Sequence, residues 1–359
     1  MTSRHFQGEA GFTFVELLVT TALALAVFLV ALMFVSLYVT LARTQPDVAD
    51  VQQRGRVAAD ILSRELADAG AWADGGGIVR GLSCCVPVLQ PRRIGTRLSD
   101  PPGTARHDVL TVVRLAPGAT PGRLREPITT GVLALESGEG CVSSRPVCGL
   151  SEGDTVIVVD TMGNHDFFLL GLPGVDSAPI ELRQEGPPHS FGPGAMAGGV
   201  ETRTYYFDAA ARQLRQYDGY LADVALVDDV VSVRFEYWGA AGVPERARAE
   251  SGTETCWFDG AGQPRFGRSS SVPGGRNVPL ALEAFRDGPW CGSGVNRFDA
   301  DLLRVRQIRA TVRVAAAAEM ARGTGTDFLI AGSASSALRL VPDVEVTLDI
   351  TPRMFSGDH

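Results

Sequence analysis

The sequence has few of the residues, and none of the motifs, on which many enzyme active sites depend. Histidine occurs only five times in 359 residues. There is no Cys-x-x-Cys pair, and no histidine lies close to a cysteine pair, which argues against a zinc site. The sequence also lacks a Gly-x-Ser-x-Gly nucleophile elbow, a P-loop and a dinucleotide-binding glycine turn between a strand and a helix. These absences predict a non-enzymatic protein without a cofactor or a bound metal.

Basic residues are also too few for a globally positive surface. The formal net charge is -8, so no nucleic-acid partner is indicated. Hydrophobic residues make up 45% of the chain, which is enough for a folded core. Methionine is scarce (6), whereas glycine (41) and proline (21) are frequent. This composition predicts many turns and short strands rather than a helical bundle.

The strongest feature is a long apolar run from residue 12 to residue 42, in which Glu16 is the only charged residue. As a helix this run would be roughly 46 Å long, which exceeds the roughly 30 Å hydrocarbon core of a bilayer. A cleaved secretory signal has a much shorter apolar core and a small-residue cleavage site. The run is therefore predicted to be a retained membrane anchor.

A short polar leader, residues 1–11, precedes the anchor and ends at Gly11. A carboxylate within an apolar span is costly and usually has a partner or a function. If the chain were cut after Gly11, the free amine of Phe12 would lie about one helical turn from Glu16. Glu16 could then pair with its own amine or with that of a neighbouring subunit.

The segment GFTFVELLV, Gly11 to Val19, resembles the cleavage and methylation motif of type IV prepilins. The resemblance implies that a prepilin peptidase cuts between Gly11 and Phe12 on the cytoplasmic side. It also implies N-methylation of Phe12 and a role for Glu16 in subunit registration. The leader departs from the family in its weak positive charge. The apolar run departs in having no internal proline, since Pro46 is the first proline after the cut. An ordinary signal anchor is the alternative.

After the apolar run, small and apolar residues recur at three- and four-residue spacing, which predicts one face of an amphipathic helix. They are Val48, Val51, Gly55, Ala58, Leu62, Leu66 and Ala69. Pro46 suits the first turn of this segment, and Gly70 suits its C-terminal stop. We therefore predict one long helix, straight or bent, over residues 12–70, with its first half in the membrane and its second half on the body.

The remainder, residues 71–359, is predicted to be a β-rich body with long loops. Alternating apolar and polar residues indicate half-buried antiparallel strands. The predicted strands are Asp229–Tyr237, Arg309–Val314 and Val344–Ile350, and shorter ones are Val109–Leu115, Thr155–Val159, Phe167–Leu170 and Glu201–Phe207. The expected loops or insertions are 71–106, 239–300 and 315–336. The predicted fold class is α+β, with one sheet packed on the second half of the helix.

Residues 52–70 and the three segments that begin at Tyr205, Leu226 and Leu302 resemble PilW-like minor pilins. They are also similar to the minor pseudopilin J of type II secretion. The resemblance implies a single-pass inner-membrane protein with a periplasmic body that later enters a filament. Its implied partners are other major and minor pilins, the prepilin peptidase and methyltransferase, the assembly platform and membrane lipid.

Three functions remain open at this point. The first is a structural minor pilin, placed at the filament tip because its large body would crowd a repeating shaft. The second is a minor pseudopilin of type II secretion. The third, from another class, is a membrane-anchored periplasmic enzyme or binding protein.

The six cysteines are an even number, which suits an oxidising compartment. Cys141 and Cys148 are close in sequence and are predicted to bridge. Cys256 and Cys291 are a weaker candidate pair, which would close the long insertion. Cys84 and Cys85 are adjacent, and because a vicinal bridge is strained they are expected to pair elsewhere.

The tetrapeptide Gly163–Asp166, GNHD, resembles one segment of the metallophosphoesterase motif. That family also needs an Asp-x-His and a Gly-Asp-x-x-Asp upstream, and neither is present. GNHD is therefore interpreted as a turn between two strands.

Overall fold

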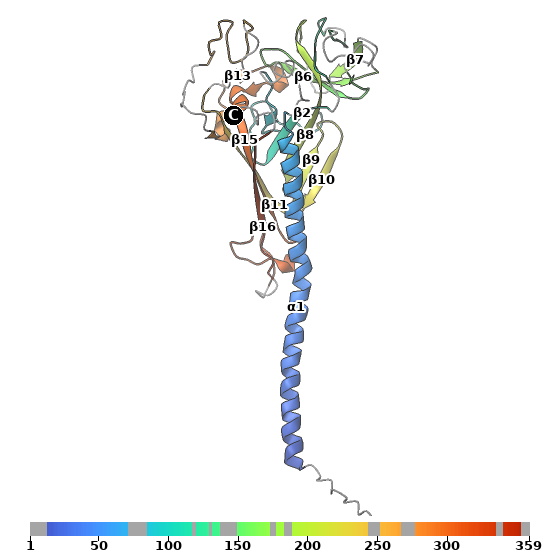
Figure 1. Ribbon diagram of the computed structural model, residues 1–359, viewed down its shortest axis with the longest axis vertical. Coiled ribbons are helices and arrows are strands. Elements are labelled where there is room, and N and C mark those ends of the chain that lie inside the picture. The colour runs from blue at the N-terminus through green and yellow to red at the C-terminus, as the bar shows by residue number, and fades with distance from the viewer. Residues whose placement is uncertain are drawn as a thin grey trace, which may run out of the picture. The chain divides into compact units, whose positions relative to one another are not determined.

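The computed structural model describes residues 13–70, 85–116, 120–128, 131–136, 149–172, 177–182, 189–242, 252–266, 277–334 and 340–352. Its first element is α1, Phe14–Ala67, a single helix of 54 residues (Figure 1). Alanine and leucine, which favour helices, are frequent along it. The helix is followed by Gly70 at φ +62°, the left-handed conformation expected of a C-terminal stop.

The prediction of one long helix is confirmed, although Pro46 does not mark the first turn of a separate segment. It lies inside α1, which is helical on both sides of it. A proline within a helix removes one backbone donor and is unfavourable by about 3 kcal/mol. The apolar segment before it and the amphipathic segment after it are both strong helices, and together they keep the backbone helical through Pro46.

The chain forms two compact units. One contains the residues up to Val51 together with Ala316–Asp343, and the other contains Gln52–Ala315 and the residues from Val344 onward. In the first unit, Ala316–Asp343 is the excursion expected between two strands, and it contains the short 3-10 helix η6, Glu319–Ala321. Backbone hydrogen bonds from Val341 to Ala321 (2.8 Å) and from Gly332 to Gly323 (2.9 Å) hold this excursion together.

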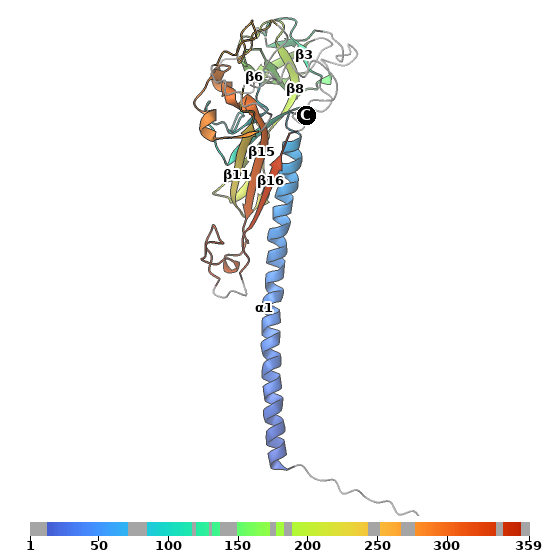
Figure 2. The same cartoon turned by 60° about the vertical axis from the view of Figure 1, so that its left-hand side comes forward.

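In the second unit, the last part of α1 packs on a four-stranded antiparallel sheet with the order β12-β11-β15-β16 (Figure 2). Its strands are β12 (Val278–Leu280), β11 (Val230–Gly239), β15 (Val305–Val314) and β16 (Val344–Ile350). The last of these has the predicted bounds, whereas β15 begins four residues earlier than predicted. Side chains of β16 alternate as expected, with Glu345, Thr347 and Asp349 exposed.

A second, ten-stranded sheet makes up most of the remaining body, so the prediction of a single sheet was wrong. Its longest strand, β8 (Met196–Asp208), pairs with β2, β3, β5 and β9 along its length. The other strands are β1 (Leu89–Gln90), β2 (Val109–Leu115), β3 (Gly122–Arg123), β4 (Val132–Ala134), β5 (Thr155–Val159), β6 (His165–Leu170), β7 (Ser177–Leu182), β9 (Gln213–Tyr217) and β10 (Asp223–Asp228). Several of these strands are too short to show alternation in the sequence.

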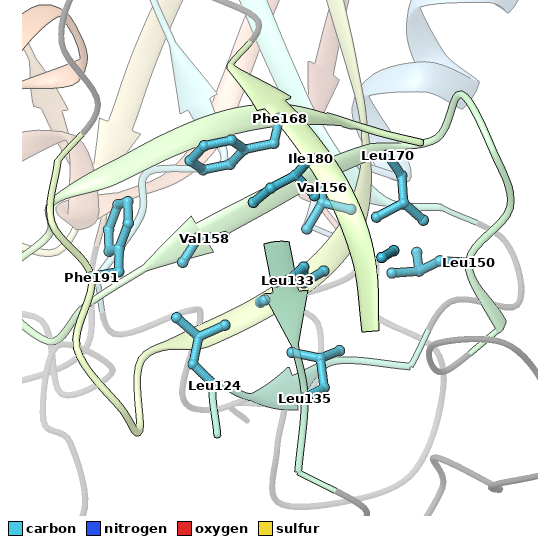
Figure 3. Packing of buried hydrophobic residues seen from close by; sticks show 12 residues of the cluster. Leu124, Leu133, Leu135, Leu150, Val156, Val158, Phe168, Leu170, Ile180 and Phe191 are labelled. Atoms are coloured by element: carbon cyan, nitrogen blue, oxygen red, sulfur yellow. The ribbon is translucent and has the colours of Figure 1, made fainter. Parts of the chain in front are cut away.

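Buried leucine, valine and phenylalanine side chains fill one end of this sheet (Figure 3). Leu124, Leu133, Val156, Phe168 and Phe191 in this cluster are each at most 3% exposed. A large core of this kind stabilises the body through the removal of apolar surface from water. The body thus has its own core within the second unit.

The region 239–300, predicted as a loop or insertion, contains several short elements. They are β12, a two-stranded ribbon of β13 (Trp290–Cys291) and β14 (Phe298–Asp299), and the 3-10 helices η3 (Leu282–Phe285), η4 (Gly294–Asn296) and η5 (Ala300–Arg304). The Trp257 side chain is 1% exposed and donates to the carbonyl of Ala300 (3.2 Å), so this insertion is folded on itself.

Candidate functional site: the apolar helix and its attachment

The first turn of α1 is closed by a reciprocal pair of hydrogen bonds between Thr13 and Glu16. The backbone N–H and the hydroxyl of Thr13 each donate to Glu16 Oε2 at 3.0 Å, and the N–H of Glu16 donates to Thr13 Oγ1 at 3.3 Å. This is a capping box, in which two otherwise unpaired backbone donors are satisfied by side chains. The Glu16 carboxylate therefore has a partner within its own chain. Gly11 and Phe12 lie outside the described residues.

Apolar side chains are exposed all round the helix from Phe14 to Val39. Examples are Phe14 (74%), Val27 (70%) and Met33 (75%). The helix is long and apolar enough to cross a membrane, although a signal sequence near the start of a chain would satisfy the same criteria. A helix that is apolar on every side, and uncovered, needs lipid or other protein around it.

The few polar side chains of this segment bond to the helix itself. The Thr20 hydroxyl donates to the carbonyl of Glu16 (2.8 Å), and the Thr21 hydroxyl donates to that of Leu17 (2.7 Å). Ser36 donates in the same way to the carbonyl of Met33 (2.9 Å). Such internal bonds allow polar residues to enter an apolar environment without an unpaired donor.

The second part of α1 packs closely on the four-stranded sheet. Ala58, Leu62 and Leu66 are fully buried, as their spacing predicted. Gly55 lies against β16, where an added Cβ would be 3.3 Å from the Val346 side chain and 3.5 Å from that of Val344. Glycine thus permits a close approach of the helix to the sheet.

Ion pairs along one side of the helix add to this attachment. Glu65 accepts from Arg114 on β2 (3.3 Å) and from Arg203 on β8 (2.8 Å). Nearer the N-terminal end of the helix, Arg54 pairs with Asp229 at 2.5 Å. These pairs are half-buried, and two arginines bind the same Glu65 carboxylate. They therefore fix the orientation of the helix on the body more than they raise the stability of the protein.

The predicted bridge between Cys256 and Cys291 is present, with the two Cα atoms 5.5 Å apart. Residues at the bridge bind the turn between β5 and β6. The N–H of Cys256 donates to the carbonyl of Thr161 (3.1 Å), and the N–H of Gly292 donates to the carbonyl of Met162 (3.1 Å). Cys85 also forms a disulfide, and no cysteine in the described part of the chain is free. Cys141 and Cys148 lie outside the described residues.

The GNHD segment is partly the turn that was expected. Gly163 and Asn164 lie in the turn. The backbone N–H groups of Met162 and Asn164 each donate to Asp160 Oδ1 at 2.9 Å and fix its conformation. His165 and Asp166, however, are the first residues of β6. Burial lowers the pKa of His165 to about 4, so its ring is neutral at pH 7.

Asp166 is held by two donors within the body. Its carboxylate accepts from the N–H of His189 (2.7 Å) and from Asn296 Nδ2 (3.0 Å), and burial raises its pKa. Within the described ranges, no three His, Cys, Asp or Glu residues lie close enough together to hold a metal ion. The described side chains of GNHD are therefore used for packing and hydrogen bonds inside the body.

Sequence reasoning singled out Glu16 but missed the partner that it has in its own chain. The signal was available, because Thr-x-x-Glu before an apolar run is the sequence signature of a capping box. Glu65 and Asp229 were also missed. Glu65 pairs with arginines 49 and 138 positions away, and Asp229 pairs with Arg54, 175 positions away, so no local pattern indicates these contacts.

In comparisons with known proteins, no protein-family model matches the chain, and no curated protein or solved structure is significantly similar to it.

Proposed function

We propose that this chain is a minor pilin, a non-enzymatic subunit that waits in the inner membrane and is then built into a type IV pilus. The observation that carries the proposal is the uncovered apolar half of α1, which continues directly into a helix packed on a folded α+β body. A subunit of this form can exchange lipid for neighbouring helices without refolding its body. The GFTFVELLV segment, with its resemblance to prepilins, supports the same conclusion.

In this proposal the leader is removed between Gly11 and Phe12, and the new amine of Phe12 is methylated. Thr13 then becomes the second residue of the mature chain, so the capping box lies directly beside the new terminus. Before assembly the box keeps the Glu16 carboxylate occupied within its own helix. In a desolvated filament core, the same carboxylate pairs with the Phe12 amine of a neighbouring subunit.

The body of the protein lies on the periplasmic side of the membrane before assembly. The disulfide of Cys256 and Cys291 supports an oxidising compartment. The partners are other pilins, the prepilin peptidase and methyltransferase, and the assembly platform. We place the subunit at the filament tip, because a body with long insertions would crowd a repeating shaft.

Two measurements on the processed end test this proposal. Mass spectrometry of the N-terminal peptide should find a mature chain that begins with methylated Phe12. An intact leader in the wild-type protein would point instead to a membrane-anchored enzyme or binding protein. Deletion of the gene should reduce piliation and twitching, whereas a loss of protein export with normal pili would assign the chain to a type II secretion pseudopilus.

The role of Glu16 can be separated from its role in the capping box. Glutamine also serves at the third position of such a box, so Glu16→Gln keeps the cap and removes the charge. Loss of one partner of a desolvated pair costs roughly 3–5 kcal/mol. Glu16→Gln should therefore be processed and stay in the membrane, but it should enter filaments poorly.

Thr13→Val is the matched control, because it removes the hydroxyl part of the cap and keeps the charge. Loss of a cap costs roughly 1 kcal/mol, so this variant should reach filaments more often than Glu16→Gln does. The readout is the ratio of sheared-filament protein to membrane-retained protein. An unchanged ratio for Glu16→Gln would exclude a pairing role for the carboxylate.

A further inference from the structure

Three polar side chains in the body are almost completely buried, and each has one atom without a hydrogen-bond partner among the described residues. The side chains are Arg92 (4% exposed), His165 (2%) and Asn296 (1%). The unpartnered atoms are Arg92 Nη2, His165 Nε2 and Asn296 Oδ1. A buried polar atom without a partner is destabilising, so three such atoms need an explanation.

Hydrogen bonds of these three residues join segments that are far apart in the sequence, and each segment has a bond to η4. Arg92, which follows β1, donates through Nη1 to the carbonyl of Val295 at 3.2 Å. The next residue, Asn296, donates through Nδ2 to the carbonyl of His165 on β6 at 2.8 Å. The positive charge of Arg92 is also close enough to His165 to contribute to the low pKa of its ring.

The existing hydrogen bonds decide what each unpartnered atom can do. Asn296 Nδ2 faces two acceptors, the His165 carbonyl and Asp166 Oδ1, so Asn296 Oδ1 is an acceptor. His165 Nδ1 lies 3.0 Å from the carbonyl of Gly163, which can only accept, so Nδ1 carries the proton of the neutral ring. His165 Nε2 is therefore also an acceptor, while Arg92 Nη2 is a donor.

One donor and two acceptors are the complement of a water molecule. We propose that a single internal water is bound here, where it accepts from Arg92 Nη2 and donates to His165 Nε2 and Asn296 Oδ1. Internal waters typically make about three hydrogen bonds to buried polar groups that lack other partners. An anion would suit Arg92 but would face the two acceptors, so it is disfavoured at this site.

The water would connect the disulfide-closed insertion to the ten-stranded sheet. Asn296 belongs to the insertion, four residues after Gly292 and close to the bridge at Cys291, whereas His165 belongs to β6. The bridge therefore closes the insertion on itself, and the water site attaches the insertion to β6. This inference concerns the body alone and does not depend on the proposed function.

A crystal structure of the full chain in detergent, at a resolution that shows ordered water, tests the site directly. We expect one density peak within hydrogen-bonding distance, about 2.7–3.2 Å, of all three atoms. A bromide soak should give no anomalous signal there. A bromide peak would assign the site to an anion, and direct bonds among the three side chains without intervening density would also overturn the proposal.

A second test uses unfolding of the full chain in detergent. If Arg92 and His165 interact only through the water, then Arg92→Met alone or His165→Phe alone removes that interaction completely. The double variant should then raise the unfolding equilibrium constant no more than the more destabilising single variant does. In the control pair, Arg265→Met with His107→Phe, the two effects should multiply. Effects that multiply for Arg92 and His165 as well would contradict a shared water.

Discussion

Replacement of His165 by phenylalanine should change how the stability of the body depends on pH. In the folded protein, burial lowers the pKa of His165 from its ordinary value of 6.5 to about 4. As the pH falls, this histidine is therefore protonated near pH 6.5 in the unfolded chain but only near pH 4 in the folded protein. As the pH falls through this window, the free energy of unfolding of the wild-type protein decreases.

The magnitude follows from the difference between the two pKa values. One pKa unit corresponds to about 1.4 kcal/mol, so the full effect at pH 4 is about 3 kcal/mol. Asp299 acts in the opposite direction, because burial raises its pKa from 3.8 to about 6. Its folded form gains a proton before the unfolded form does, which stabilises the protein as the pH falls from 6 to 4. In the wild-type protein, the pH dependence contributed by Asp299 would thus offset much of that contributed by His165.

The assay compares urea unfolding of the full chain in detergent at a series of pH values for His165→Phe and the wild type. The difference in free energy of unfolding between the two should shift by about 3 kcal/mol in favour of His165→Phe between pH 7 and pH 4. Asp299→Asn should steepen the acid-induced loss instead. His107→Phe removes the same group from an exposed position and is the matched control. A difference that stays constant across the pH range would refute the assignment of a buried, neutral His165.

Three further predictions concern the attachment of α1 and the bridges. Gly55→Leu should destabilise the body by about 1–3 kcal/mol, because the new leucine side chain would collide with Val346. In the same urea assay, Val57→Leu on the exposed side of the helix should have little effect. Leu62→Ala should cost about 2–5 kcal/mol and Val57→Ala much less, and equal losses would show that the buried face of the helix was wrongly assigned. Non-reducing peptide mapping should recover Cys256 linked to Cys291, and it also decides whether Cys141 is linked to Cys148. Cys291→Ser should lower the free energy of unfolding by about 2–4 kcal/mol.

The sequence was sufficient for the parts of the fold that carry a strong periodic pattern. The bounds of β16 and the buried face of α1 at Ala58, Leu62 and Leu66 were correctly predicted, because each depends on regular spacing within one segment. The single helix that runs through Pro46 was also correctly predicted, although proline's preference for a first turn suggested a new segment there. The α+β class itself followed from these patterns together.

Features that depend on contacts across the chain could not be predicted. The two-residue strands β1 and β3 carry no detectable pattern, and they form only because longer strands lie beside them. The bonds that join His165 and Arg92 to η4 likewise connect positions 131 and 203 residues apart. In contrast, the capping box of Thr13 and Glu16 was within reach of sequence analysis, because it is a local signature.

The bridge between Cys256 and Cys291 also has a consequence for resistance to proteases. It spans 35 positions and encloses an exposed turn, residues 260–263. Exposed turns are preferred sites of proteolytic cutting. A single cut in this turn would leave both pieces covalently joined, so the nicked chain would migrate intact until its disulfides were reduced. The protein would therefore keep its insertion attached after a cut at this turn.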